Sequence, residues 1–438
     1  MKGLLLSGLM LGAGLASAAP VTITFEQAMT GPNAKALDAL VKVFEASHPN
    51  IHVRNISEGG YSSLNVKILA QIAAGSPPTL AQMYPSGATN FIQDGEMVPV
   101  AKFMSPHAAL REELYPAMLA SGRYPNGEIW LLPFNKSDIV LYYNKTLFDK
   151  LGLKPPTSWA ALRKDAPLLT DPSAKRAMLA DNFGNDTFQA FVNSTGSRVL
   201  TKGESDPVFA TDGAGARVLS LWHQLVSKGQ AVVTAHFDYE VLFGNGNAAV
   251  ITASIAELPY IQKAVGHHFQ LGVAPMPAGP TGQGKVYTKL YGSDIGIFAK
   301  GPNASPAQQS AAWAFASFLV SPKAQAYWVE HTGYLPANRM AYARLLQDGY
   351  FKTVAGRAKL VAIAELAHAV PTHFSGWWDQ FAWRSGSPLP SLIQSAVKGD
   401  STPEQAMAKA LTDAQRLIRR EGNWLAKVKV AYLKALAQ

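Results

Sequence analysis

Segments with strand composition alternate with helical segments near the start of the chain, and this order constrains the fold more than any other feature. Strands are predicted at Val21–Phe25, Ile51–Ile56 and Thr79–Met83. The segments between them, 37–44 and 62–74, repeat apolar residues at helical spacing and so present one apolar face. This order predicts an α/β fold with a mainly parallel sheet covered by helices. Such sheets bind ligands at the carboxyl ends of their strands.

The alternation continues along the rest of the 438 residues, a length that suits two or three domains. Three further strands are predicted at Ile139–Tyr143, Ala248–Thr252 and Ile295–Ala299. Helices are predicted to begin at Ser305 and Thr402, because each is followed by proline and then, three positions on, by glutamine, the pattern of a capping box. The last third of the chain is predicted to be mostly helical.

The first eighteen residues resemble a cleaved secretory signal. Lys2 supplies a positive charge, Gly3–Leu15 is apolar, and Ala16-Ser17-Ala18 offers small residues to a signal peptidase. The apolar run is too short for a bilayer core of about 30 Å, so we expect residues 1–18 to be removed after Ala18. A buried N-terminal helix is the alternative. Export predicts a periplasmic protein.

The chain contains no cysteine. Disulfides, thiolate metal sites, thiol nucleophiles and a lipid-anchored N-terminal cysteine are therefore excluded. The net charge of +9 invites a nucleic-acid partner, but the lysines and arginines are dispersed and form no basic run. We expect no nucleic-acid binding. The positive charge is compatible with attraction of an anionic solute, although solubility alone would explain it.

Catalytic motifs are largely missing. The sequence has neither the Gly-x-Ser-x-Gly elbow of serine hydrolases nor a zinc-binding His-Glu-x-x-His pair. Gly244-Asn245-Gly246 precedes a strand, which favours a turn over a phosphate cradle, and His267-His268 is also interpreted as a turn. We expect no enzyme activity, no metal and no cofactor. Paired carboxylates that are distant in sequence stay possible, so a secreted glycan-processing enzyme remains the alternative from another class.

Several motifs resemble the extracellular solute-binding proteins of carbohydrate-type ABC importers, and in particular the members that bind glycerol 3-phosphate. The matching stretches keep the family's order over more than 300 residues. They are Gly59-Gly60-Tyr61, Tyr84, Leu132–Asn135, Val140–Lys145, Thr252–Ser254, Gly292, Phe318–Pro322, His331–Pro336 and Thr402–Ala406.

The resemblance implies a two-lobed, type II-like periplasmic-binding-protein fold. The first lobe would comprise residues 19–136 and 271–333, and the second 137–270 and 334–438. A solute held between the lobes would favour the closed state. The closed protein, expected to be a monomer, would then deliver its solute to the membrane permease of the transporter.

The resemblance also implies ligand-binding residues. Tyr61 and Tyr334 align with ligand-contacting tyrosines, Ser137 and Ser254 with hydroxyl contacts, and Gly292 with a glycine whose backbone N–H can approach an anion. The alternatives are a loop aromatic for Tyr61, a capping or turn role for Ser137, and a turn role for Gly292.

Arg384 is the candidate cationic anchor, since a guanidinium can bind phosphate in a bidentate manner; a surface arginine is the alternative. It follows the densest aromatic cluster, Trp377–Trp383, whose rings could pack on sugars or quaternary ammonium groups or simply pack between lobes. Two stretches depart from the glycerol-phosphate binders. Pro85 replaces an acidic residue, and Asp181–Gly184 replaces tryptophans. The predicted solute is glycerol 3-phosphate or a glycerophosphodiester, with a sugar or oligosaccharide as the alternative.

Overall fold

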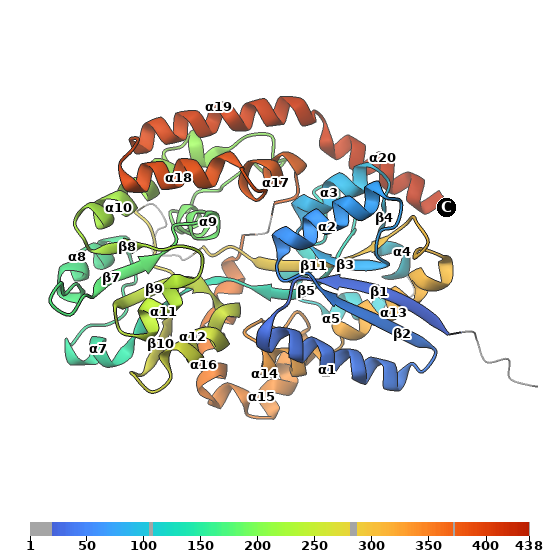
Figure 1. Ribbon diagram of the computed structural model, residues 1–438, viewed down its shortest axis with the longest axis horizontal. Coiled ribbons are helices and arrows are strands. Elements are labelled where there is room, and N and C mark those ends of the chain that lie inside the picture. The colour runs from blue at the N-terminus through green and yellow to red at the C-terminus, as the bar shows by residue number, and fades with distance from the viewer. Residues whose placement is uncertain (1–19, 105–107, 281–286, 371–372, 438) are drawn as a thin grey trace, which may run out of the picture.

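The computed structural model describes residues 20–104, 108–280, 287–370 and 373–437. Two β-sheets lie side by side in it, each flanked by helices (Figure 1). The chain crosses between the sheets more than once, so each half of the molecule is built from separate stretches of sequence. We refer to the half around the sheet that contains β1 as the first lobe, and to the other half as the second lobe. The predicted signal, residues 1–18, lies outside the described residues.

The sheet of the first lobe has six strands, and its central strand is long and buried. The strand order is β2 (Ile51–Ser57), β1 (Val21–Gln27), β3 (Leu80–Met83), β11 (Tyr291–Phe298) and β4 (Met97–Val98), with β5 (Leu132–Ser137) also paired to β11. The predicted β-α-β-α-β unit is confirmed, since β1 runs parallel to β2 and to β3. Strand β11 runs antiparallel to β3, β4 and β5.

The sheet of the second lobe has five strands. The order is β10 (Leu271–Ala274), β6 (Ile139–Asn144), β9 (Ala248–Ser254), β7 (Ala177–Asp181) and β8 (Ala231–Val233). Strand β6 is antiparallel to both neighbours, and β7 is parallel to both of its own. The two-lobed α/β prediction is confirmed, but the sheets are mixed rather than mainly parallel. The difference arises because β6 and β11, which follow the crossovers between the lobes, enter their sheets in the opposite direction.

Helices cover both sheets. The main helices that precede the first crossover or return to the first lobe are α1 (Gly31–Ser47), α2 (Tyr61–Ala73), α3 (Pro85–Gln93), α4 (Ala101–Met104), α5 (Ala108–Glu113), α6 (Pro116–Ala120), α13 (Pro306–Leu319), α14 (Pro322–His331), α15 (Arg339–Gln347) and α20 (Trp424–Ala437). The others are α7 (Lys145–Lys150), α8 (Trp159–Leu169), α9 (Asn185–Ser194), α10 (Ala214–Ser227), α11 (Asp238–Gly244), α12 (Leu258–Val265), α16 (Val354–Glu365), α17 (Gly376–Ala382), α18 (Pro388–Lys398) and α19 (Pro403–Glu421). Helix α17 packs against α3 and α19, and α20 packs against α3 (Figure 1).

The predicted helix starts are confirmed at atomic detail. Ser305 and Thr402 each accept a hydrogen bond from the glutamine N–H three residues on, and that glutamine completes a capping box. These caps satisfy N–H groups that a helix end leaves unpaired. At the other end of α19, Arg419 and Arg420 lie in the last turn, where the helix dipole favours positive charge.

A buried ion pair lies where the chain leaves the first lobe. Lys136 Nζ lies 2.7 Å from Asp294 Oδ1, and both side chains are fully buried. Ser121 Oγ donates to the same carboxylate at 2.6 Å. The pair ties β5 to β11, and the chain then passes through Asp138 into β6. Lys136 also pairs with Leu335 on the returning segment, so several connections between the lobes meet here.

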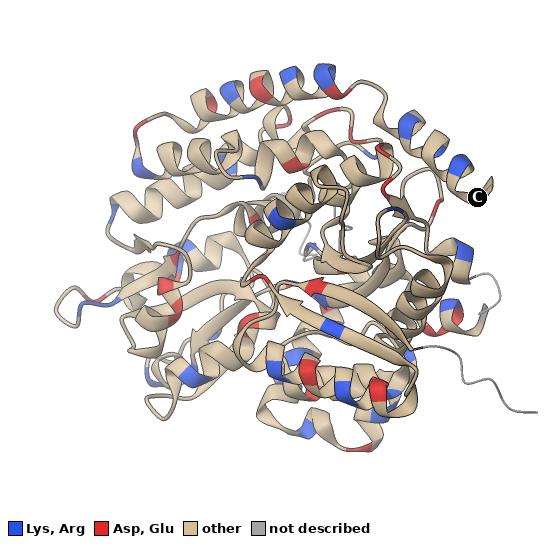
Figure 2. Cartoon of the chain, turned by 45° about the vertical axis from the view of Figure 1, so that its right-hand side comes forward, with Lys and Arg blue, Asp and Glu red and all other residues tan. Residues whose placement is uncertain are grey.

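Charged side chains of both signs are spread over the helices (Figure 2). In the part of the chain that the structure describes, no helix combines the length and apolar character needed to cross a membrane.

Candidate ligand-binding site

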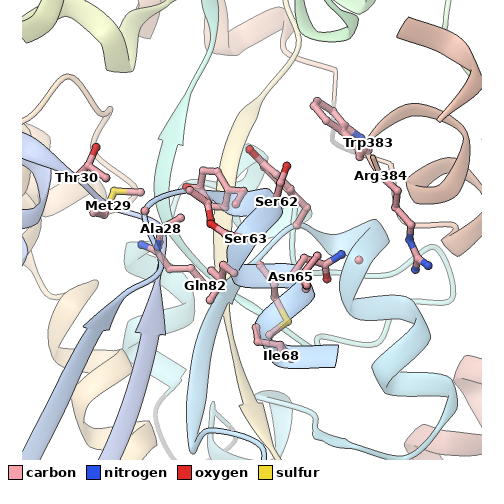
Figure 3. Close-up of a pocket in the computed structure, with 18 of the residues that line it drawn as sticks. Ala28, Met29, Thr30, Ser62, Ser63, Asn65, Ile68, Gln82, Trp383 and Arg384 are labelled. Carbon is pink, nitrogen blue, oxygen red and sulfur yellow. The ribbon is translucent and has the colours of Figure 1, made fainter. Parts of the chain in front are cut away.

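A cavity of about 810 Å³ lies between segments of the two lobes. The carboxyl ends of β1 and β3 and the starts of α1, α2 and α3 form its first-lobe wall, as expected for a sheet whose strands end at a ligand site. Figure 3 shows this wall, with Trp383 and Arg384 on the other side of the cavity. The lining residues used below are Thr30, Tyr61, Ser62, Gln82, Tyr84, Glu240, Glu257, Tyr260, Tyr334, Asp379, Trp383 and Arg384.

The structure places two of the predicted tyrosines in the cavity lining. Tyr61 begins α2, and its hydroxyl donates to Ser293 at 3.2 Å while it accepts from the Asn135 amide at 2.8 Å. The Tyr334 hydroxyl contacts Met29 Sδ at 3.7 Å, and its ring stacks on Trp328 at a centroid distance of 5.5 Å. These contacts hold both rings in place.

An aromatic wall crosses the cavity. The ring of Tyr84 lies 4.7 Å from that of Tyr61 and stacks on Trp383, with centroids 5.4 Å apart and planes at 20°. The ammonium of Lys289 lies over the indole of Trp383, 5.7 Å from the ring centroid. Trp383 follows α17, so residues distant in sequence build one aromatic surface of the kind that packs on sugar C–H groups. Within the Trp377–Trp383 cluster, Trp377 and Trp378 are instead buried in the core.

Arg384 lies in the cavity lining, but its charge is already paired. Its Nε donates to Asp379 Oδ2 at 2.6 Å, with the arginine side chain 36% exposed and the aspartate 6%. Burial raises the pKa of Asp379, and the guanidinium acts in the opposite direction. The pair therefore presents little net charge to a solute in this state.

Two carboxyl groups from the second lobe were not predicted. Glu257 accepts from the Tyr239 hydroxyl at 2.7 Å and from the Ser254 N–H at 3.3 Å, and Glu240 lines the same part of the cavity. Burial raises the pKa of Glu257 to about 8. Nearby, the Tyr260 hydroxyl donates to the Thr30 carbonyl at 3.1 Å and joins the two lobes at the cavity. Nothing in the local sequence marks these residues, because only tertiary packing brings α11 and α12 to α1.

The other predicted site residues lie outside the cavity lining. Ser137 is the buried last residue of β5. The Ser254 hydroxyl accepts from the Ala256 N–H at 3.1 Å and caps the short helix Ile255–Glu257. Gly292 has φ of +92°, and a Cβ there would overlap the Asn135 carbonyl. The structure thus gives Ser254 a capping contact and Gly292 a close approach of two backbones.

Other stretches that the sequence singled out are also structural. Asp181 is buried and accepts from Thr252 Oγ1 and, at 2.6 Å, from the Phe183 N–H; its burial raises its pKa to about 7. Asn182 accepts from the Gly184 N–H at 2.8 Å. Gly246, with φ of +77°, lies in the predicted turn before β9. Among the described residues, no group of three or more histidine, aspartate or glutamate side chains is arranged to hold a metal ion.

Comparison with known proteins agrees with this architecture. The chain is 25% identical over 421 residues to the sn-glycerol-3-phosphate-binding periplasmic protein of Pectobacterium atrosepticum. The alignment covers 92% of each chain. The structure of UgpB from Mycobacterium tuberculosis with glycerophosphocholine superimposes with a TM-score of 0.77 at 20% identity, covering 92% of this chain and 100% of that one.

Sugar-binding proteins share the fold equally well. The GacH receptor of Streptomyces glaucescens, solved with and without acarbose, gives a TM-score of 0.77 at 19% identity, covering 92% of this chain and 99% of that one. A family model described as bacterial extracellular solute-binding protein matches residues 30–326. The chain therefore belongs to the family of bacterial extracellular solute-binding proteins.

Proposed function

We propose that this protein captures glycerol 3-phosphate or a related glycerophosphodiester in the cavity between its lobes and delivers it to the permease of an ABC importer. Residues 1–18 act as a signal that is removed on export to the periplasm. The proposal rests on one observation, the presence of Tyr61, Tyr334 and Arg384 on a single cavity formed by segments from both lobes. Relatives named for glycerol 3-phosphate over nearly the whole chain support it.

The size of the cavity favours a diester. Small-molecule sites commonly have volumes of about 300–1,000 Å³, and the 810 Å³ here lies in the upper part of that range. Glycerol 3-phosphate alone would leave much of this volume filled by water, whereas a second group esterified to the phosphate would occupy it. The stacked Tyr84 and Trp383 rings offer an apolar surface for such a group.

A sugar or oligosaccharide is the second candidate. Sugars present apolar C–H faces to aromatic rings and hydroxyl donors to carboxylates, and this cavity supplies Trp383 as well as Glu240 and Glu257. Pairing of Arg384 with Asp379 also lowers the demand for an anionic solute. The fold shared with sugar-binding proteins supports this alternative.

The two lobes supply the means of capture. We propose the boundaries expected from the sequence, 19–136 plus 271–333 and 137–270 plus 334–438, with two changes. Strand β10 belongs to the second lobe, because it pairs with β6, and helices α15 and α20 belong to the first. The crossovers act as the hinge. A solute that contacts Tyr61 of the first lobe and Glu257 of the second favours the closed arrangement in proportion to its differential affinity for the two states. The protein works as a monomer in this scheme.

A thermal-shift screen followed by calorimetry tests the proposed solute. The panel contains glycerol 3-phosphate, glycerophosphocholine, glycerophosphoethanolamine, maltose and maltotriose. We expect saturable one-to-one binding of at least one phosphate ester. Binding of the maltooligosaccharides alone would replace the phosphate ester with the sugar while leaving the capture role in place. Hydrolysis of any compound, followed by chromatography of the mixture, would indicate an enzyme instead.

A further inference from the structure

The first-lobe wall of the cavity is built from helix starts that lack the usual caps. Helices α1 and α2, of 17 and 13 residues, both begin at the cavity, and no described side chain caps either one. Their first internal hydrogen bonds are Ala34 N–H to Thr30 at 3.2 Å and Leu64 N–H to Gly60 at 3.0 Å. The N–H groups of each first turn are therefore left for water or a ligand.

Neither first turn contains an acidic residue. The positive end of a helix attracts anions, and proteins commonly place aspartate or glutamate there when no ligand is expected. The exposed Ser62 adds a hydroxyl to the second position of α2 and lines the cavity. By contrast, the start of α3 already faces a carboxylate, since a Cβ on Gly87 would lie 3.8 Å from Asp379 Oδ1.

A buried side-chain amide in the same wall has a nitrogen without a hydrogen-bond partner among the described residues. Gln82 lies near the end of β3, is fully buried and lines the cavity. Its Oε1 accepts from the Ala28 N–H at 3.1 Å, which holds the amide beside the segment leading into α1 (Figure 3). Within the described part of the chain, its Nε2 makes no hydrogen bond. An unpaired buried N–H group is costly, so this nitrogen is a donor suited to an acceptor that arrives with the solute.

We infer that the wall formed by the first turn of α2, the start of α1 and the Gln82 amide is the subsite for the oxyanion of the solute, a phosphate group in the case of a glycerol phosphate. This inference rests on the proposed function and adds the place where the charge is held. Backbone N–H groups, the Ser62 hydroxyl and Gln82 Nε2 would donate to the phosphate oxygens. Arg384 is neutralised by Asp379 and is not the main anchor.

The opposite wall fits the rest of such a solute. Glu240 and Glu257 accept hydrogen bonds, as the hydroxyls of glycerol or a sugar require, and the raised pKa of Glu257 limits its repulsion of a nearby anion at neutral pH. The cavity thus separates donors on α2 from acceptors across it.

The replacement Ser62→Asp tests the subsite without threatening the fold. An aspartate at the second position of an uncapped helix complements the helix dipole, so the melting temperature should stay the same or rise. The same carboxylate would occupy the anion position, and we expect the affinity for glycerol 3-phosphate or glycerophosphocholine to fall about tenfold or more. Met340→Asp is the control for a carboxylate added to a helix start, since exposed Met340 holds the second position of α15, which Asn338 caps, outside the cavity.

A second variant, Gln82→Met, removes the donor without adding charge and should lower the affinity for the phosphate ester about fivefold. Calorimetry is performed on the full mature protein with inorganic phosphate as a competitor. If the wild type binds a phosphate ester and Ser62→Asp changes that affinity by less than twofold, the subsite is overturned. The proposed function would then stand. Failure of the wild type to bind any phosphate ester would overturn the proposed solute itself, and with it the subsite.

Discussion

Arg384 Nε lies 2.6 Å from Asp379 Oδ2 at the edge of the cavity, so the one arginine that the sequence proposed as an anion anchor is part of an ion pair. Removing only the arginine would leave an unpaired carboxylate facing the solute. We therefore expect Arg384→Ala to weaken binding of a phosphate ester, and Arg384→Ala combined with Asp379→Asn to recover most of the loss. Calorimetry of the two variants measures this coupling.

A different result would restore the original assignment. If the double variant loses at least as much affinity as Arg384→Ala alone, with a loss equivalent to roughly 2–5 kcal/mol, Arg384 is a direct anchor of the ligand charge. Asp379→Asn alone is the control and should strengthen anion binding slightly, because the guanidinium would then be free.

Gly292 provides a test of backbone geometry that is separate from binding. Gly292 and Gly127 have φ of +92° and +91°, but a Cβ on Gly292 would overlap the Asn135 carbonyl, whereas one on Gly127 would meet no atom within 4 Å. In both alanine variants the free energy of unfolding should fall by about 1–2 kcal/mol, because alanine is strained in the left-handed backbone region. Gly292→Ala should lose several kcal/mol more, measured by urea unfolding. Equal losses would mean that β5 and β11 can separate at no cost.

The buried pair of Lys136 and Asp294 should have a large effect on the free energy of unfolding when only one partner is removed. Lys136→Met leaves Asp294 as a buried unpaired carboxylate, and the free energy of unfolding should fall by about 3–5 kcal/mol. Adding Asp294→Asn should recover a substantial part. Urea titrations followed by tryptophan fluorescence provide the measurement, and a loss below about 1 kcal/mol for the single variant would contradict the burial of this pair.

Glu365 predicts a dependence of stability on pH. Burial raises its pKa from 4.5 to about 8, so the folded state binds this proton more tightly than the unfolded state. The stabilisation of the folded state by this proton is complete below pH 4.5 and is lost as the pH rises toward and through 8. Glu365→Gln should therefore flatten the fall in stability between pH 5 and pH 9, by an amount on the order of a few kcal/mol.

Asp138 also has a raised pKa, through burial and the nearby Glu365, and would leave a residual slope in that variant. Thermal melts at five pH values compare the wild type with Glu365→Gln. Parallel curves for the two proteins would show that Glu365 titrates as an ordinary exposed carboxyl. Glu404→Gln, at an exposed position in the first turn of α19, is the control for the loss of one carboxylate.

Features encoded by neighbouring residues were predictable from the sequence. The capping boxes at Ser305 and Thr402 depend on residues three positions apart, and the parallel pairing of β1 with β2 follows from a short crossover. The direction of β11 was not predictable, because it depends on where the chain returns after building the second lobe. The mixed sheets are therefore a consequence of long-range topology.

The site was predictable in part for the same reason. Tyr61 and Tyr334 lie in recognisable local motifs, and both line the cavity. Gln82 and Glu257 lie in segments with no marked motif, and only the assembled lobes show that they face one cavity. Ser254 shows the converse, since its place at a strand end agrees with a ligand contact, yet its hydroxyl caps a short helix.

Small-angle X-ray scattering of the mature protein, with and without each candidate solute, tests the central claim most directly. If the lobes close on a solute held between them, a compound that binds by calorimetry should reduce the radius of gyration, and the other compounds should leave it unchanged. A scattering curve that stays the same with every phosphate ester and sugar, together with no heat of binding for any of them, would contradict solute capture by this cavity.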